Sequence, residues 1–200
     1  MKPRTLYERY PDIADDPDEV LFADVRKHWI GLLAIYLIGV LMIILAVLLA
    51  SLTPWFAHAG GVALTAEALS LVWLGAIVLT ALVLIGTLIA AWVYQASHLL
   101  ITNENVIEVR QISLFSRKVS HLNMINVEDV TVSKNGIFQT LLNYGRLLIQ
   151  TAGERENFNF TYTPDPNTYR RYIIQAHEAA ITRAGQAGVA QRIEVARGNL

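Results

Sequence analysis

The chain contains no cysteine, and charged residues make up only 16% of it, against roughly a quarter in ordinary globular domains. The absence of cysteine excludes disulfides, thiolate catalysis and cysteine-ligated metal sites. The shortage of charge is local, because residues 29–66 and 68–103 contain no Asp, Glu, Lys or Arg and only Glu67 separates them. Hydrophobic residues reach 54%. The composition is therefore that of a membrane protein.

Sequence signatures of catalysis are missing as well. The chain has neither a GxSxG nucleophile motif nor a phosphate-binding GxxxxGK[ST] loop. Its histidines lack metal-ligand spacing, and neighbouring acidic residues such as Glu128 and Asp129 point to opposite faces of a strand. Lys and Arg are too dispersed for a nucleic-acid-binding face. We therefore expect no catalytic residue, no metal, no cofactor, no small-molecule substrate and no nucleic-acid partner.

Two apolar stretches are long enough to span a bilayer, for which a helix needs about 20 residues. They cover residues 29–51 and 69–94, and neither has the polar face of a soluble core helix. The small residues Gly86 and Ala90, one turn apart, favour close packing of the two helices. Interfacial anchors, which are typically aromatic or basic, are expected at Arg26, Lys27, Trp29, Trp55, Trp92 and Tyr94.

The distribution of basic residues predicts the orientation of these spans. Basic residues precede the first span, are absent from residues 52–68 between the spans, and resume at Arg110. Since loops rich in Lys and Arg remain in the cytoplasm, we expect residues 1–28 to be a cytoplasmic tail and residues 52–68 an extracytoplasmic loop. The chain after residue 94 is then cytoplasmic.

After the second span the pattern becomes that of a β-rich domain over residues 95–184. Alternating apolar and polar residues separated by turn residues predict strands over 99–101, 106–109, 116–121, 127–133, 146–151 and 156–162. A turn is expected over residues 152–154. An amphipathic helix follows, with Asp165 as its cap and Pro166 at its first position. Gly185 and Gly188 are expected to end it, which leaves residues 185–200 as a flexible tail.

Four segments carry a family resemblance. They are residues 136–145 (GIFQTLLNYG), 149–153 (IQTAG), 101–107 (ITNENVI) and 125–130 (INVEDV). Together they resemble the bacterial pleckstrin-homology (PH) membrane proteins of the YdbS-like kind, over roughly residues 10–184. The resemblance implies a bent sheet of about seven strands closed by a C-terminal amphipathic helix, a two-helix transmembrane hairpin, a bacterial plasma (inner) membrane location, and no enzymatic activity.

Four apolar residues between two predicted strands form a candidate interaction surface. Ile137, Phe138, Leu141 and Leu142 recur at i, i+1, i+4 and i+5, which is one face of a short helical turn. Either they fold back into the core, or they form a docking surface for a protein partner or a second copy of the chain. The second interpretation makes the protein a non-enzymatic adaptor at the inner leaflet.

Arg117 and Lys118 form a candidate contact with lipid headgroups, because a basic side chain near an anionic membrane surface contributes about 1 kcal/mol. A plain solvated turn is the alternative. Asn103 and Glu104 occupy the first hairpin turn, where eukaryotic PH domains carry the basic residues that hold phosphoinositides, and we expect no such recognition here. The alternative function is a module that responds to anionic lipid through a weakly basic face.

Overall fold

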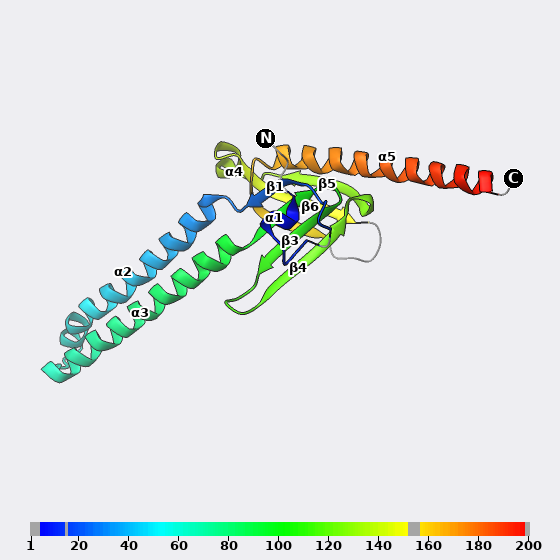
Figure 1. Ribbon diagram of the computed structural model, residues 1–200. Coiled ribbons are helices and arrows are strands. Elements are labelled where there is room, and N and C mark those ends of the chain that lie inside the picture. The colour runs from blue at the N-terminus through cyan, green and yellow to red at the C-terminus, as the bar shows by residue number, and fades with distance from the viewer. Residues whose placement is uncertain (1–4, 15, 152–156, 199–200) are drawn as a thin grey trace. The chain divides into compact units, whose positions relative to one another are not determined.

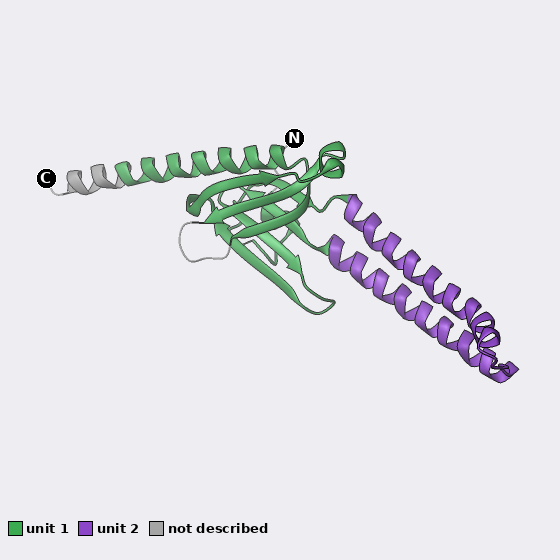
Figure 2. Ribbon diagram, turned by 180° about the vertical axis from the view of Figure 1, so that it is seen from behind, with its two compact units in different colours: residues 1–28, 96–200 green, residues 29–95 purple. Residues whose placement is uncertain are grey.

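The computed structural model describes residues 5–14, 16–151 and 157–198, with side chains as far as Val189. The chain forms two compact units (Figure 2). Residues 29–95 form the hairpin, and residues 1–28 together with 96–200 form what we call the domain. The hairpin is thus an insertion within the sequence of the domain.

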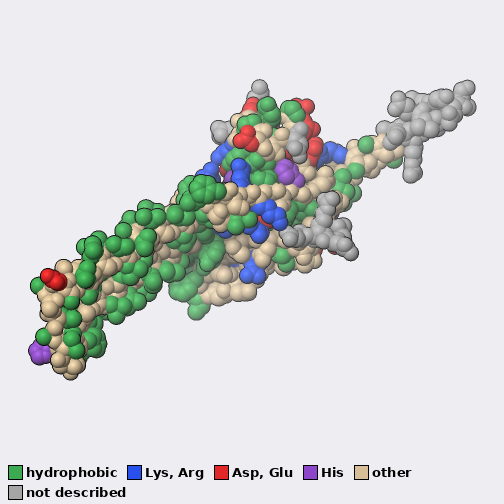
Figure 3. Space-filling model, turned by 90° about the horizontal axis from the view of Figure 1, so that it is seen from below, with side chains coloured by type: hydrophobic (Ala, Val, Ile, Leu, Met, Phe, Trp, Pro, Cys, Tyr) green, Lys and Arg blue, Asp and Glu red, His purple; other side chains and the backbone are tan. Residues whose placement is uncertain are grey.

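The hairpin consists of helices α2 (Trp29–Ala59) and α3 (Ala66–Ala96), each 31 residues long. At 1.5 Å per residue each measures about 46 Å, which exceeds the roughly 30 Å hydrocarbon core of a bilayer. Both are long and apolar enough to cross a membrane. Figure 3 shows hydrophobic side chains covering the visible face of this unit, and most of its large apolar side chains are exposed. A soluble core helix would bury them.

The helices extend beyond the predicted spans, so most of the predicted loop over residues 52–68 is helical and only residues 60–65 separate them. Pro54 lies within α2 near its C-terminal end. Apolar and small residues continue past residue 51, and α2 continues with them through Pro54 to Ala59.

The two helices pack through small residues on α2. A Cβ atom at Gly31 would lie 2.2 Å from the hydroxyl of Tyr94, and one at Gly39 would lie 2.5 Å from the hydroxyl of Thr87. Gly86, by contrast, has open space around its Cβ position, and Ala90 is exposed. The prediction that Gly86 and Ala90 pack the hairpin is therefore wrong, because they point away from the facing helix.

The described part of the domain contains two antiparallel sheets (Figure 1). The first has the strand order β1 (Leu21–Arg26), β2 (His98–Thr102), β3 (Asn105–Gln111) and β4 (Arg117–Asn123). The second has the order β5 (Val127–Ser133), β6 (Tyr144–Thr151) and β7 (Phe158–Pro164). A 3-10 turn, η1 (Met124–Asn126), joins the sheets, and a short helix, α4 (Ile137–Leu141), joins β5 to β6. The predicted turn over residues 152–154 and residue 156 lie outside the described residues.

One apolar core lies between the sheets and is closed by helix α5 (Pro166–Gly198). The core combines side chains from both sheets with Ile173, Ala176 and Ala180 of α5. Polar contacts also hold the helix in place: Arg170 Nε donates to the Val130 carbonyl at 2.9 Å, and His177 Nδ1 lies 2.6 Å from the Met124 carbonyl. This arrangement confirms the predicted fold, a membrane-type hairpin with a seven-stranded PH-like domain.

The N-terminal segment is part of the domain, so the interpretation of residues 1–28 as a tail is wrong. Helix α1 (Leu6–Arg9) and strand β1 cover and extend the first sheet. Leu6 and Ile13 form a second core with Leu100 and Ile107 on the outer face of that sheet. Both faces of β2 and β3 are therefore buried, and this explains their nearly continuous apolar sequence.

Helix α5 also differs from its prediction. It continues through Gly185 and Gly188 to Gly198, so the flexible tail predicted over residues 185–200 is wrong as far as residue 198. A glycine inside a helix costs about 1 kcal/mol relative to alanine. That cost weakens a helix without ending it when alanines flank the glycines, as they do at positions 184 and 187.

Candidate functional site

The chain enters and leaves the hairpin at one end of the domain, which we call the exit end (residues 26–28 and 96–98). β1 and β2 pair antiparallel with Arg26 opposite His98. The two connections to the hairpin therefore leave from adjacent strands of one sheet, so both lie on the same side of the domain.

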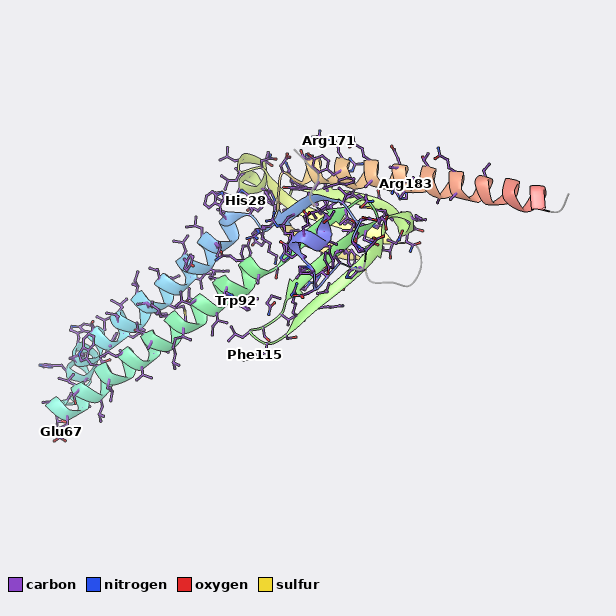
Figure 4. All side chains as sticks on the ribbon, viewed as in Figure 1. His28, Glu67, Trp92, Phe115, Arg171 and Arg183 are labelled. Carbon is purple, nitrogen blue, oxygen red and sulfur yellow. The ribbon has the colours of Figure 1, made fainter. Side chains whose placement is uncertain are left out.

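His28, the last residue before the first membrane helix, joins the exit end to the second sheet. Its backbone N–H donates to the carbonyl of Tyr162 on β7 at 2.6 Å. Its ring stacks on Tyr144 with 5.1 Å between ring centroids, and Tyr144 stacks in turn on Tyr162 at 5.8 Å. The start of β6 and the end of β7 are thereby fixed at the exit end, where Figure 4 places His28.

The predicted interaction residues lie on α4, immediately before β6. Ile137, Phe138 and Leu141 are 71% to 82% exposed, whereas Leu142 is half-buried. The interpretation that these residues fold into the core is therefore wrong for the first three, which we call the α4 patch. Tyr144 lies three residues after Leu141 and stacks on His28, which belongs to the exit end. The α4 patch therefore lies at the exit end as well.

Hydrogen bonds within the α4 turn hold the α4 patch in its outward position. Gly136 adopts a φ of 113°, a conformation that a side chain would strain. The Gln139 side-chain carbonyl accepts from the backbone N–H of Asn135 at 2.6 Å, and Lys134 Nζ donates to the side chain of Asn143. These bonds fix the shape of the turn while its apolar side chains are exposed.

Apolar side chains are also exposed on the turn between β3 and β4, which the sequence analysis did not identify. Phe115 is 98% exposed, and Ile112 and Leu114 are exposed beside it; we call these three the β3–β4 tip. Figure 4 shows Phe115 at the end of the ribbon formed by the two strands. Arg117 and Lys118, the predicted headgroup contacts, follow at the start of β4, and both are exposed. The signal was present in the sequence as three apolar residues where turns normally carry Gly, Asn or Asp.

A polar cluster lies beside His98 at the exit end. Asp24 Oδ2 accepts from the Tyr10 hydroxyl at 3.0 Å and lies 3.2 Å from Nη2 of Arg9. The His98 ring stacks on Tyr10 with 5.4 Å between centroids, and its Nδ1 donates to the Ala96 carbonyl at 3.0 Å. The last residue of the second membrane helix is thus hydrogen-bonded to the first strand that follows it.

Burial lowers the pKa of His98 below its ordinary value of 6.5. The Ala96 carbonyl and the Asp24 carboxylate act in the opposite direction, while Arg26 and Arg117 lower the pKa further. The ring is therefore neutral near pH 7, with Nδ1 carrying the proton, because a carbonyl can only accept. Its buried Nε2 has no hydrogen-bond partner among the described residues.

The predicted membrane anchors occupy two different environments. Trp29, Trp55 and Trp92 are exposed on the hairpin, whereas Tyr94 is half-buried and lies against Gly31. Arg26 is exposed at the end of β1.

Lys27 is half-buried in the domain, with its ammonium 6.0 Å from the centre of the Phe160 ring. Burial lowers the pKa of Lys27, Arg110 lowers it further, and Glu108 opposes both. Lys27 thus packs against the domain at the point where the chain leaves it. Its predicted anchoring role, like that of the other five residues, stays a prediction.

The β2–β3 turn, residues 103–104, lies at the opposite end of β3 and is held by a buried glutamate. Glu19 is 2% exposed, and its Oε1 accepts from the Thr102 hydroxyl and from Asn105 Nδ2. Arg183 of α5 donates to the Asn103 carbonyl at 2.9 Å. Sequence reasoning missed Glu19 because an acidic residue 83 positions before Thr102 gives no local sign of burial.

The histidine and acidic side chains of the described residues are dispersed. In that part of the chain no three His, Asp or Glu side chains lie close enough to share a metal ion. Glu128 and Asp129 are both exposed on β5. The candidate binding surfaces are the two exposed apolar ones at the exit end, the α4 patch and the β3–β4 tip.

Two sheets with seven strands among the described residues, closed by a helix and joined to a membrane-type hairpin, define a PH-like module with exposed apolar turns. A family model described as bacterial PH domain matches residues 20–177, which is more than half of the chain. The chain belongs to the bacterial PH domain family. No curated protein and no solved structure gave a significant match. PH domains are generally non-catalytic binding modules, and the narrower YdbS-like grouping stays an expectation.

Proposed function

We propose that this protein is a non-enzymatic binding module anchored in the bacterial plasma membrane by its hairpin, with the domain and both chain ends in the cytoplasm. The pairing of Arg26 with His98 carries the proposal. Because the hairpin leaves and re-enters the domain through adjacent paired strands, two spans return the chain to its starting side. Every residue outside the hairpin then shares one compartment.

The charge distribution supports the cytoplasmic side. Arg26 and Lys27 adjoin the first span, and residues 52–66 contain no charged residue at all. Short segments rich in Lys and Arg are retained in the cytoplasm. The connection between α2 and α3 is accordingly extracytoplasmic.

The α4 patch is the docking surface in this proposal. It presents three exposed apolar side chains on a turn fixed by its own hydrogen bonds, and exposed apolar clusters of this kind are typical of protein contacts. Residues 137–142 carry no charge. Because the exit end stays near the bilayer, the partner is a second membrane protein or another copy of this chain, and the shared membrane raises its effective concentration.

Photo-crosslinking in native membranes tests the adaptor proposal. A photoreactive residue at Phe138 is expected to capture a protein, and the double substitution Phe138→Ser with Leu141→Ser is expected to abolish the corresponding complex without unfolding the domain. Ile125→Ser is the matched control, because Ile125 is also an exposed apolar residue, 51% accessible, on η1. Persistence of the complex in the double variant, or capture of lipid alone, contradicts the adaptor function.

A second candidate function, a response to anionic lipid, is supported by the exposure of Arg117 and Lys118 beside the β3–β4 tip. Salt distinguishes the two functions. Headgroup binding weakens steeply as ionic strength rises, whereas an apolar protein interface changes little.

A further inference from the structure

We propose that the β3–β4 tip inserts into the headgroup layer of the membrane that holds the hairpin, and that Arg117 and Lys118 bind the phosphates of anionic lipids around it. This inference rests on the proposed membrane attachment. It adds a second, non-covalent contact between the domain and the bilayer.

The side chains of the tip suit a bilayer interface. Ile112, Leu114 and Phe115 are exposed together on one turn, with Phe115 exposed almost completely. An aqueous turn ordinarily carries polar residues or glycine. Aromatic and aliphatic side chains on an otherwise polar element are what interfacial segments place among the lipid headgroups.

Backbone polar groups of the turn are hydrogen-bonded within the turn, as a poorly hydrated environment requires. The N–H groups of Ile112 and Ser113 both donate to the carbonyl of Ser116, at 2.9 Å and 3.2 Å. Gln111 Nε2 donates to the Ser113 carbonyl at 2.7 Å. Satisfying backbone polar groups internally is the main requirement for entering lipid, and here these bonds also fix the shape of the tip.

The register of the first sheet places the tip at the exit end. Val109 pairs with His98, and the N–H of Gln111 donates to the hydroxyl of Ser97 at 3.1 Å. Ser97 directly follows the second membrane helix. Since β3 runs antiparallel to β2, its turn continues past Ser97, and two further residues at roughly 3.3 Å each extend about 7 Å. Interfacial elements bury their apolar face about 5–10 Å deep, which is comparable to this length.

The charges beside the tip favour a lipid occupant over a protein. Arg117 and Lys118 follow the tip after a single residue, Ser116, and a cytoplasmic leaflet is rich in anionic lipid that attracts such residues. The α4 patch lies at the same end, but residues 137–142 carry no charge and the nearby Lys134 ammonium donates to the Asn143 side chain. For that reason we assign the two surfaces to different occupants.

Depth-dependent quenching in vesicles tests this assignment. The chain has no cysteine, so Ser113→Cys provides a single attachment site for an environment-sensitive fluorophore and preserves all three apolar residues. The full-length protein is reconstituted into vesicles of phosphatidylcholine and phosphatidylglycerol, some of whose acyl chains carry a nitroxide quencher. Glu128→Cys is the matched control, because Glu128 is exposed on β5, whose first residues lie at the other end of the domain.

We expect the nitroxide to quench the probe at position 113 and not the probe at position 128. Quenching should be lost when Ile112, Leu114 and Phe115 are all replaced by Ser, and retained when Phe115 is replaced by Leu. The change of both Arg117 and Lys118 to Gln should reduce quenching in anionic vesicles but leave it unchanged in pure phosphatidylcholine.

Three results overturn the inference. The first is an unquenched, water-exposed probe at position 113. The second is quenching that persists in the triple Ser variant, because simple tethering near the surface then explains it. The third is a photo-crosslink from position 113 to another copy of the chain in place of lipid. None of these results affects the membrane attachment itself, which fails only if the hairpin does not span.

Discussion

Strand β3 connects two turns that use their side chains in opposite ways. At the β2–β3 turn, Thr102 and Asn105 donate hydrogen bonds to Glu19, which is almost completely buried. At the β3–β4 turn the apolar side chains point outward, and Phe115 has hardly any contact with the rest of the described chain. The two turns lie at opposite ends of the domain, one at the exit end and one away from it.

This difference indicates that the two ends of the domain have different tasks. A turn that buries its polar groups contributes to stability and has little left to offer a ligand. A turn that leaves three apolar side chains exposed contributes almost nothing to the folded state of an isolated chain, so its sequence requires another explanation. Substitutions at the first turn should therefore affect folding, and substitutions at the second should affect binding.

Glu19→Ala is expected to have the largest effect on stability. It removes the acceptor shared by the part-buried Asn105 amide and the Thr102 hydroxyl, which should lower the free energy of unfolding of the domain by about 3 kcal/mol. Hydrogen exchange in peptides from β2 and β3, which should be faster in the variant, measures this loss of stability. Glu128→Ala, at an exposed position on β5, is the control. Equal exchange in both variants would show that Glu19 does not hold the turn.

The hairpin shows a similar contrast, between a glycine that contacts the facing helix and a glycine that does not. Gly39→Leu places a side chain against Thr87, where even a Cβ atom would lie 2.5 Å away, and should destabilise the packing of the helices by about 2 kcal/mol. Gly86→Leu projects into open space and should change stability by less than about 0.5 kcal/mol. All four tryptophans lie in the hairpin, so tryptophan fluorescence during detergent-induced unfolding reports this unit alone. A greater loss of stability from Gly86→Leu than from Gly39→Leu would mean that a different face of α3 contacts α2.

A smaller effect is expected from pH at the exit end. Since burial lowers the pKa of His98 in the folded state, the unfolded chain binds more protons just below pH 6.5. The stability that the neutral His98 contributes is complete above about pH 6.5, and it decreases as the pH falls toward the pKa of His98 in the folded state. His98→Phe, which keeps a ring beside Tyr10, should remove this part of the pH dependence in hydrogen exchange of β2. An unchanged slope in the variant would assign the pH dependence to other groups.

The smallest effect on folding is expected at the β3–β4 tip. Phe115→Ser should change the free energy of unfolding in detergent by less than about 0.5 kcal/mol, because the side chain is 98% exposed. Thermal unfolding followed by circular dichroism measures this change. A loss comparable to that of Glu19→Ala would show that the tip is structural, and the contrast between the two turns would disappear.

Local patterns in the sequence predicted most of the architecture. Uncharged stretches predicted both membrane helices, alternation predicted β2 to β7 within a few residues, and Asp165 with Pro166 predicted the start of α5. Strand β1 was missed because its partner β2 lies beyond the entire hairpin, and residues 21–26 (LFADVR) follow an acidic segment that reads as a tail. The end of α5 was missed because glycine weakens a helix without necessarily ending it.

The candidate site was predictable only in part. The spacing of Ile137, Phe138 and Leu141 indicated one helical face, but spacing cannot distinguish a core face from an exposed one. The β3–β4 tip required the register between β3 and β2 before its place at the exit end became visible. Glu19 required knowledge of burial, which depends on contacts between residues distant in the sequence.

The most direct test of the account is the sidedness of two single cysteines in a chain that has none of its own. Val62→Cys lies in the exposed connection between α2 and α3, and Glu128→Cys lies on the exposed face of β5. In intact spheroplasts, a membrane-impermeant maleimide is expected to label position 62 at once and position 128 only after lysis. Labelling of position 128 in intact spheroplasts, or equal labelling of both positions before and after lysis, would contradict a membrane-spanning hairpin that holds a PH domain in the cytoplasm.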